Sequence, residues 1–252
     1  MRQQVASFLL AVQFLTRIPL NISGIYSPDR MAASVRYYPA VGILIGALTA
    51  ALYAGACYIL PHYIAVLLAI CGGLLITGAF HEDGLADTFD GMGGGSTRER
   101  ALEIMKDSRL GTYGTLALLS VMVLKAASLF ALTPALLITS LIAAHGLSRL
   151  SSVCVIATSR YVRDEGTGKP VAGGISLSGL AVAAGTGCLI FALWSSSQPL
   201  PALGFGLLGL VLGHVFMRLI VERKLGGYTG DTLGAVQQVS EIGFYLGVAA
   251  WA

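Results

Sequence analysis

The sequence has few charged residues. Asp, Glu, Lys and Arg make up 12% of its 252 residues, whereas hydrophobic residues make up 55%. The charged share is about half that of a soluble domain, which excludes an ordinary soluble fold. The formal net charge of +3 is too small to indicate a nucleic-acid partner. The composition therefore predicts an integral membrane protein with several transmembrane helices.

Cysteine is also scarce. The four cysteines, Cys57, Cys71, Cys154 and Cys188, lie inside apolar runs and form no C-x-x-C pair. This spacing supports neither a zinc site nor a framework of disulfide bonds. The sequence predicts instead that they are small hydrophobic side chains buried in the protein.

Long apolar runs predict an all-α, polytopic helical bundle in a single membrane domain that covers residues 1–252. Residues 3–16 have an apolar helical face but are fewer than the about 20 residues that cross a bilayer, so we expect an interfacial amphipathic helix there. The seven predicted spans are 40–60, 63–80, 113–132, 135–157, 173–194, 201–221 and 233–251.

The connections between these spans alternate in charge. Those at 61–62, 133–134 and 195–200 contain no Lys or Arg. Most basic residues lie in the N-terminal segment and in the loops near 81–112, 158–172 and 222–232. The positive-inside rule places this second group in the cytoplasm and the C-terminus outside.

An acidic stretch follows the apolar run that ends at Phe80. Asp83, Asp87 and Asp90 stand at i, i+4 and i+7, so a helix that continues through them would place three carboxylates on one face. Like charges at this spacing repel, and a bound cation would remove the repulsion. Oxygen ligands select a hard cation such as Mg²⁺, Mn²⁺ or Ca²⁺. The stretch predicts a metal site, with Glu82 beside it as a further candidate ligand.

A run of glycines comes directly after the acidic stretch. We expect the backbone N–H groups of Gly93, Gly94 and Gly95 to face a phosphate. Ser96-Thr97-Arg98-Glu99 then has the capping-box spacing that begins a new helix. Metal ligands, a phosphate-binding glycine run, a helix N-terminus and nearby basic side chains are the groups that phosphoryl transfer requires.

The last predicted span carries polar residues on one helical face, among them Asp231, Gln238 and Glu241. Polar groups inside a membrane are costly, so we expect this face to point into the bundle interior. An ion pair between Lys125 and Glu241 is one arrangement that would satisfy both charges. The same expectation of an interior position applies to His145, Arg149, His214 and Arg218.

Four motifs occur in order along the chain: Phe-Leu-Thr-Arg-Ile-Pro (14–19), His-x-Asp-Gly-Leu-Ala-Asp-Thr-x-Asp-Gly (81–91), Thr-Arg-Glu-Arg … Glu-Ile-Met-Lys-Asp-Ser-Arg-x-Gly-Thr-Tyr-Gly (97–114) and Gly-Gly-Tyr-Thr-Gly-Asp-x-Leu-Gly-Ala-x-Gln-Gln (226–238). Together they resemble the cobalamin synthase family, the adenosylcobinamide-GDP ribazoletransferases. Glu82 departs from the family pattern, in which an apolar residue is expected.

The resemblance implies the last assembly step of the cobalamin (vitamin B12) nucleotide loop. In that step α-ribazole or its 5′-phosphate attacks the cobinamide-linked phosphate of adenosylcobinamide-GDP, GMP leaves, and Mg²⁺ is required. The expected location is a bacterial or archaeal inner membrane, and the charge pattern of the connections places the motifs, and with them the active site, on its cytoplasmic face. The expected partners are the two substrates and membrane lipid, and no nucleic acid is expected. The sequence leaves open whether the protein forms a homo-oligomer.

The same reaction suggests a role for each candidate. The catalytic candidates are His81, Asp83, Asp87, Asp90 and Asp231, of which the three central aspartates hold Mg²⁺. His81 or Asp231 would accept the proton of the attacking hydroxyl, and the ordinary pKa of His81 suits this better. The candidate substrate-binding residues are Gly93, Gly94, Gly95, Arg98, Lys106, Asp107, Arg109, Arg160, Arg163 and Gln238.

Two alternatives compete with this interpretation. Asp87-Thr-Phe-Asp90-Gly91 also fits the core of the CDP-alcohol phosphotransferases, but Gly94-Gly95 stands where Ala-Arg is expected and no Asp-x-x-x-Asp follows. A transporter would explain charges within the membrane. Against it, the acidic cluster lies at one rim of the membrane and the two halves of the chain do not repeat each other.

Overall fold

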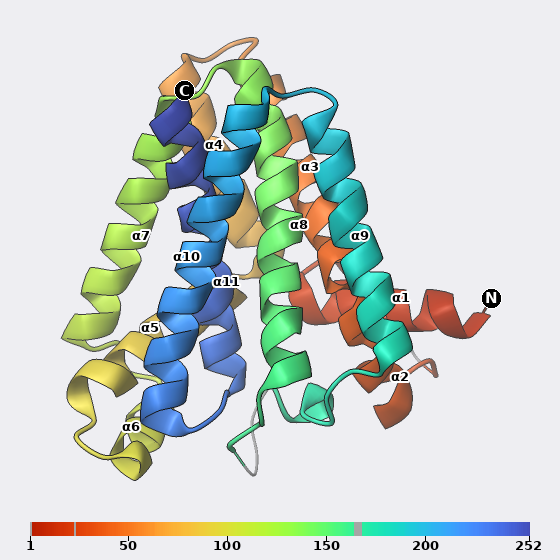
Figure 1. Ribbon diagram of the computed structural model, residues 1–252, viewed down its shortest axis with the longest axis vertical. Helices are drawn as coiled ribbons and strands as arrows, with labels where there is room; N and C mark the ends of the chain where they lie inside the picture. The colour runs from red at the N-terminus through yellow and green to blue at the C-terminus, as the bar shows by residue number, and fades with distance from the viewer. Residues whose placement is uncertain (1, 23, 164–167) are drawn as a thin grey trace.

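The long helices run up and down between the two ends of one bundle (Figure 1). The computed structural model describes residues 2–22, 24–163 and 168–252. The long helices are α3 (Tyr38–Ala56), α4 (His62–Thr77), α7 (Thr112–Phe130), α8 (Pro134–Thr158), α9 (Leu177–Ser195), α10 (Leu200–Leu225) and α11 (Gly230–Trp251). The shorter helices are α1 (Arg2–Leu15), α2 (Pro28–Ser34), α5 (Phe80–Gly94) and α6 (Arg98–Ile104), with 3-10 turns at Val35–Tyr37 and Lys169–Val171.

The predicted all-α polytopic membrane fold is confirmed. Within the described residues, five helical stretches are long and apolar enough to cross a membrane. Four of them are the single helices α7, α8, α9 and α10, and the fifth, Pro28–Ala56, includes α3. The bent pair α4 and α5 would count as a sixth. The seventh predicted span is the helix α11, which is more polar than the others because it carries the buried residues Gln237, Gln238 and Glu241.

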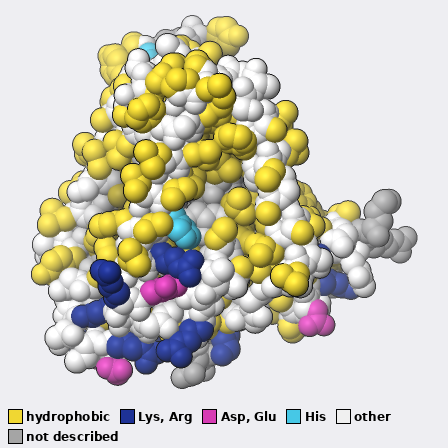
Figure 2. Space-filling view, viewed as in Figure 1, with side chains coloured by type: hydrophobic (Ala, Val, Ile, Leu, Met, Phe, Trp, Pro, Cys, Tyr) yellow, Lys and Arg dark blue, Asp and Glu magenta, His cyan; other side chains and the backbone are white. Residues whose placement is uncertain are grey.

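All four shorter helices gather at one end of the bundle, which we call the polar end (Figure 1). Figure 2 shows that the Lys, Arg, Asp and Glu side chains visible on this face also collect there, whereas the rest of the face is largely hydrophobic. The connections at 61–62, 133–134 and 195–200 lie at the opposite end. The helix α1 lies across the bundle at the polar end, as expected for an interfacial helix.

A sharp bend separates α4 from α5. Gly78 and Ala79 both adopt left-handed backbone conformations, with φ of 66° and 55°, and the two helices meet at 87°. The acidic stretch therefore belongs to a new helix and does not continue the preceding one. Because of this bend, α5 lies across the polar end, outside the five spanning helices, and presents its carboxylates there.

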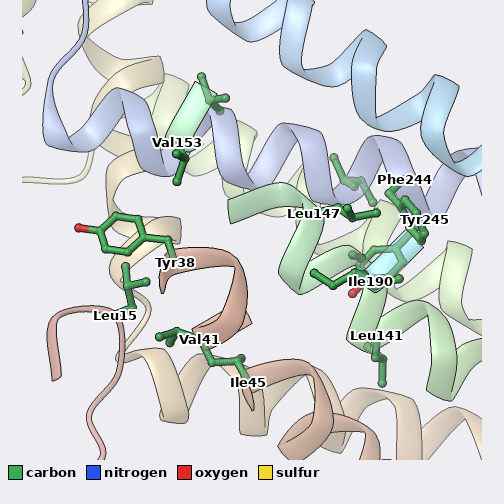
Figure 3. Packing of buried hydrophobic residues seen from close by; sticks show 14 of the residues in the cluster. Leu15, Tyr38, Val41, Ile45, Leu141, Leu147, Val153, Ile190, Phe244 and Tyr245 are labelled. Atoms are coloured by element: carbon green, nitrogen blue, oxygen red, sulfur yellow. The ribbon is translucent and has the colours of Figure 1, made fainter. Parts of the chain in front are cut away.

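Close helix packing holds the bundle together. In the α10–α11 pair, a Cβ atom on Gly209 or Gly243 would collide with the backbone of the other helix. Small residues at such crossings allow the backbone contact that drives helix association in membranes. Large buried side chains, such as Ile45, Leu141 and Phe244, fill the space between helices elsewhere in the bundle (Figure 3).

The prediction that the cysteines are buried was wrong. Cys57, Cys71 and Cys188 are exposed and Cys154 is partly exposed, although all four are free thiols as expected. The reason is that helices in a membrane turn apolar side chains outward as well as inward, so an apolar run does not imply burial within the protein.

Candidate active site

The acidic helix α5 crosses the beginning of α11 at two glycines. A Cβ atom on Gly84 would lie 2.7 Å from the carbonyl oxygen of Asp231, and one on Gly234 would lie 2.9 Å from that of His81. Larger side chains would separate the two helices. The glycine crossing therefore brings Asp83 and Asp87 beside Asp231, which is 148 positions after Asp83 in the sequence (231 minus 83).

Asp231 is held in the first turn of α11 by a capping box. The hydroxyl of Thr229 accepts a hydrogen bond from the N–H of Thr232 at 3.2 Å, and the hydroxyl of Thr232 accepts one from the N–H of Thr229 at 2.8 Å. Nη1 of Arg163 donates to Oδ2 of Asp231 at 2.5 Å. Two further nitrogens of Arg163 are buried and have no hydrogen-bond partner in the part of the chain that the structure describes, so this guanidinium group can still donate to an anion.

The three carboxylates of Asp83, Asp87 and Asp231 are close enough to repel one another. Burial first, and then the charges of Asp231 and Asp83, raise the pKa of Asp87 to about 7. Burial also raises the pKa of Asp231, against the opposing effect of Arg163. The carboxylates of Asp87 and Asp231 are thus less stable in their charged forms than they would be in water, and a cation beside them would remove this cost.

A cavity of about 620 Å³ opens next to these carboxylates. It lies between α1, the α4–α5 bend and the beginning of α11, and its volume is in the range of small-molecule sites. Its walls include Asp83 and Asp231, together with Arg17. The other lining residues are Leu10, Gln13, Phe14, Thr16, Tyr26, Met31, Thr77, Phe80, Pro170 and Gly230.

Asp90, the third predicted ligand, has a different environment. Its two carboxylate oxygens accept hydrogen bonds from the N–H groups of Gly111 and Gly114, both at 2.8 Å. These N–H groups belong to the N-terminus of α7, where a negative charge is favourable. The side chain therefore caps a helix, and this contact explains its burial without a metal ion.

The glycine run does not form the open loop that a phosphate nest requires. Gly93 and Gly94 are the last residues of α5, and the N–H of Gly95 donates to the carbonyl of Gly91 at 3.0 Å. A Cβ atom on Gly95 would lie 2.5 Å from Cα of Ala101 in α6. These glycines allow close packing at the end of α5, and their predicted contact with substrate stays a prediction.

Two of the basic candidates, Arg98 and Arg160, bind the end of a helix. Arg98 and Arg160 each donate through Nε to a carbonyl at the C-terminus of α10, that of Leu225 and that of Gly226 respectively, both at 2.8 Å. A positive charge is favourable at this helix end, so both arginines have a structural role. Lys106 is exposed in the loop after α6.

Arg109 belongs to a second cavity of about 390 Å³ on the other side of α5. Its guanidinium group pairs with Asp107 and lowers the pKa of that carboxyl to about 2. Gly94 and Asp90 line this cavity too, and its other arginine, Arg100, is paired with a neighbouring glutamate. None of the predicted substrate-binding residues lines the large cavity, whereas Gly94, Asp107 and Arg109 line this second one.

Glu82 and Gln238 point into the bundle interior, away from the large cavity. Nε2 of Gln238 donates to Oε1 of Glu82 at 2.9 Å, and Nζ of Lys125 donates to Oε1 of Gln238 at 3.2 Å. Lys125 also pairs with Glu241 at 2.9 Å, which confirms the predicted contact. His145 lies 3.2 Å from the same Glu241 carboxylate.

His81 lies on the same inner side of α5. Its side chain is buried, and its Nδ1 has no hydrogen-bond partner among the described residues. It lines two small internal cavities and is not on the wall of the large one. The arrangement therefore places Asp231, and not His81, next to the site where substrate could bind.

Comparison with known proteins identifies the family. The family model for cobalamin-5-phosphate synthase matches residues 7–249. The chain belongs to this family. A relative from Shewanella frigidimarina (strain NCIMB 400) is 42% identical over 255 residues, which is 98% of this chain and 95% of the relative. Another from Leptothrix cholodnii is 43% identical over 246 residues, 95% and 93% of the two chains.

Both relatives are named adenosylcobinamide-GDP ribazoletransferase. No solved structure matches the chain. The family is the one that the four motifs predict, and these comparisons give no support to the CDP-alcohol phosphotransferase or transporter alternatives.

The residues of this family member fit a hard divalent cation for which the protein supplies only some of the ligands. Within the described ranges, no three His, Cys, Asp or Glu side chains are close enough to form a complete metal site. Magnesium commonly uses one or two carboxylates and completes its shell with water and substrate phosphates. The raised pKa of Asp87 and the exposed carboxylate of Asp83 are consistent with such an incomplete site.

Sequence reasoning missed two residues of the large cavity, Arg17 and Tyr26. Arg17 lies in the Phe-Leu-Thr-Arg-Ile-Pro motif, which was the available signal. Its role was hidden because nothing in the spacing shows that the end of α1 packs beside the beginning of α5, where the rings of Phe14 and Phe80 meet.

Proposed function

We propose that the chain transfers the adenosylcobinamide phosphate group from adenosylcobinamide-GDP to α-ribazole or its 5′-phosphate. A hydroxyl oxygen of ribazole forms a bond to the cobinamide-linked phosphorus, the bond from that phosphorus to the GMP phosphate breaks, and GMP leaves. The observation that carries the proposal is a ligand-sized cavity with carboxylates on its wall in a chain whose relatives carry this enzyme name.

Asp83 and Asp87 would hold Mg²⁺ at the edge of this cavity. When bound, Mg²⁺ supplies charge neutralisation to the diphosphate. The glycine crossing with α11 fixes the distance of these two carboxylates from Asp231, so the residues that would hold the ion and the proposed proton acceptor keep a constant arrangement. Positioning of this kind supplies much of the rate in phosphoryl transfer.

Asp231 is the side chain placed to accept the proton from the attacking hydroxyl. It lines the cavity opposite α5, and Arg163 fixes its orientation. The other candidate, His81, is on the wrong side of α5 for a substrate in this cavity. Asp231 therefore replaces His81 as the proposed proton acceptor.

The protein crosses the membrane several times, and we propose that its polar end faces the cytoplasm of a bacterial or archaeal cell. In a variant without the four native cysteines, Ser197→Cys should react with an impermeant maleimide in intact cells, and Ser96→Cys only after lysis. Both serines are exposed, so access to the thiol is decided by the side of the membrane. Labelling of Ser96→Cys from outside would contradict the orientation.

Release of GMP tests the proposed reaction itself. The purified chain in detergent or lipid discs should release GMP only when adenosylcobinamide-GDP, α-ribazole and Mg²⁺ are all present. Omission of α-ribazole separates transfer from simple hydrolysis. GMP release without α-ribazole at the full rate would show a hydrolase and would contradict the proposal.

A further inference from the structure

The large cavity contains a cation that has no side-chain partner among the described residues. Arg17 is exposed on its wall, and its backbone N–H is fixed by the carbonyl of Ile76 at 2.7 Å. Its guanidinium group makes no hydrogen bond or ion pair with any described residue. A guanidinium group whose backbone is anchored beside a ligand-sized space is suited to bind phosphate oxygens in a bidentate manner.

Other arginines near the two cavities have partners in the protein. Arg163 pairs with Asp231, although two of its nitrogens keep donors for an anion, and Arg109 pairs with Asp107. Arg98 and Arg160 cap the end of α10. Among the described residues that line the large cavity, Arg17 is therefore the cation whose charge is available to a ligand.

The same cavity has aromatic walls. Phe14 and Phe80 pack edge to face, with ring centroids 5.4 Å apart, and both line the cavity. Tyr26 lines it from the loop before α2, and 61% of this residue is exposed. An exposed ring at the edge of a cavity offers a face on which a planar base can stack.

We propose that this cavity binds the nucleoside diphosphate part of the activated substrate. Arg17 binds the diphosphate, and Tyr26 stacks on the base. This inference rests on the proposed function and assigns to the large cavity the substrate whose phosphate gains negative charge in the reaction. α-Ribazole, with or without its 5′-phosphate, gains no such charge during the transfer, whereas charge builds up on the phosphate of the departing nucleotide as the bond breaks, and an arginine can neutralise it.

The beginning of α11 supports the same assignment. Gly230 and Asp231 line the cavity, so the positive end of this 22-residue helix faces the same space as Arg17. A phosphate there would lie between Arg17, the helix end and the carboxylates of the proposed Mg²⁺ site. These three features place the diphosphate at the α5 side of the cavity and the base toward Tyr26.

The test measures binding of GDP to the full-length protein in detergent, in the presence of Mg²⁺, together with the kinetics of GMP release. Arg17→Gln should weaken GDP binding and raise the KM for adenosylcobinamide-GDP by about tenfold or more, since it removes a charge-assisted hydrogen bond. Arg17→Lys, which keeps the charge, should recover part of the loss. The KM for α-ribazole should not change in either variant.

Tyr26→Ala provides a second variant with little risk to folding, because the ring is largely exposed. It should weaken GDP binding severalfold. Arg36→Gln is the matched control: Arg36 donates to the carbonyl of Ala33 and does not line the cavity, so its variant should bind GDP like the wild type.

Wild-type GDP affinity in both Arg17→Gln and Tyr26→Ala would overturn the inference, as would a rise in the KM for α-ribazole alone. GMP release by the wild-type protein tests the proposed reaction separately. Binding of GDP that depends on Arg17, without any GMP release from both substrates, would leave the nucleotide site in place and contradict the proposed transfer.

Discussion

Asp87→Asn is expected to abolish Mg²⁺-dependent GMP release while the protein still inserts into the membrane and folds. The change keeps the size of the side chain but removes the negative charge that a hard cation requires. Burial, followed by repulsion from Asp231 and Asp83, raises the pKa of the native carboxyl to about 7, and the change to Asn removes that repulsion. Stability without metal should therefore be unchanged or slightly higher. GMP release and a thermal melt of the same preparation measure the two effects.

Asp90→Asn is the matched control for this prediction. Asp90 accepts hydrogen bonds from the N–H groups of Gly111 and Gly114, so its variant weakens the cap of α7. A loss of about 1 kcal/mol in the free energy of unfolding is typical for a damaged cap. The contrast between an inactive, stable Asp87→Asn and a less stable Asp90→Asn distinguishes a metal ligand from a capping residue. Near-normal turnover by Asp87→Asn would place the metal elsewhere.

Removal of one member of the buried Lys125–Glu241 pair is expected to have the largest effect on stability. The side chains are 8% and 1% exposed, and their charged atoms are 2.9 Å apart. Lys125→Met leaves the Glu241 carboxylate buried without its cation, which costs about 3–5 kcal/mol in comparable buried pairs. Glu241→Gln should cost a similar amount, and the double variant should cost clearly less than the sum of the two.

Arg218 and Glu222 provide the matched control pair. They lie one turn apart on α10, 2.9 Å from each other, and both are partly exposed. Breaking this pair should cost less than about 1 kcal/mol. Denaturant or thermal unfolding in one detergent measures all variants. Independent, additive effects of Lys125→Met and Glu241→Gln would show that the two charges do not stabilise each other.

The helices could be predicted from the sequence because each long apolar run has about the length that a helix needs to cross a bilayer. All seven predicted spans correspond to helices, and the predicted N-terminal segment is α1. The bend between α4 and α5 could not be predicted, because Ala79 adopts a left-handed conformation that its residue type does not favour. Local patterns identify helices, but they do not give the angle between them.

The candidate site was predicted only in part, for the same reason. The spacing of Asp83 and Asp87 indicated a shared helical face. Asp83 lines the large cavity, and Asp87 lies close enough for the charges of Asp231 and Asp83 to act on its carboxyl group. The cap that Asp90 provides to α7 depends on residues 21 and 24 positions away. Contacts of this kind depend on how helices pack, and the spacing of residues within one helix does not contain that information.

The central claim is that Asp83 and Asp87 hold a divalent cation at the nucleotide cavity. Electron paramagnetic resonance of Mn²⁺, used in place of Mg²⁺, measures this directly in the full-length protein with GDP. The wild type should convert free Mn²⁺ into a bound form, and Asp83→Asn and Asp87→Asn should each lose most of that binding. Undiminished Mn²⁺ binding in both variants would contradict the claim.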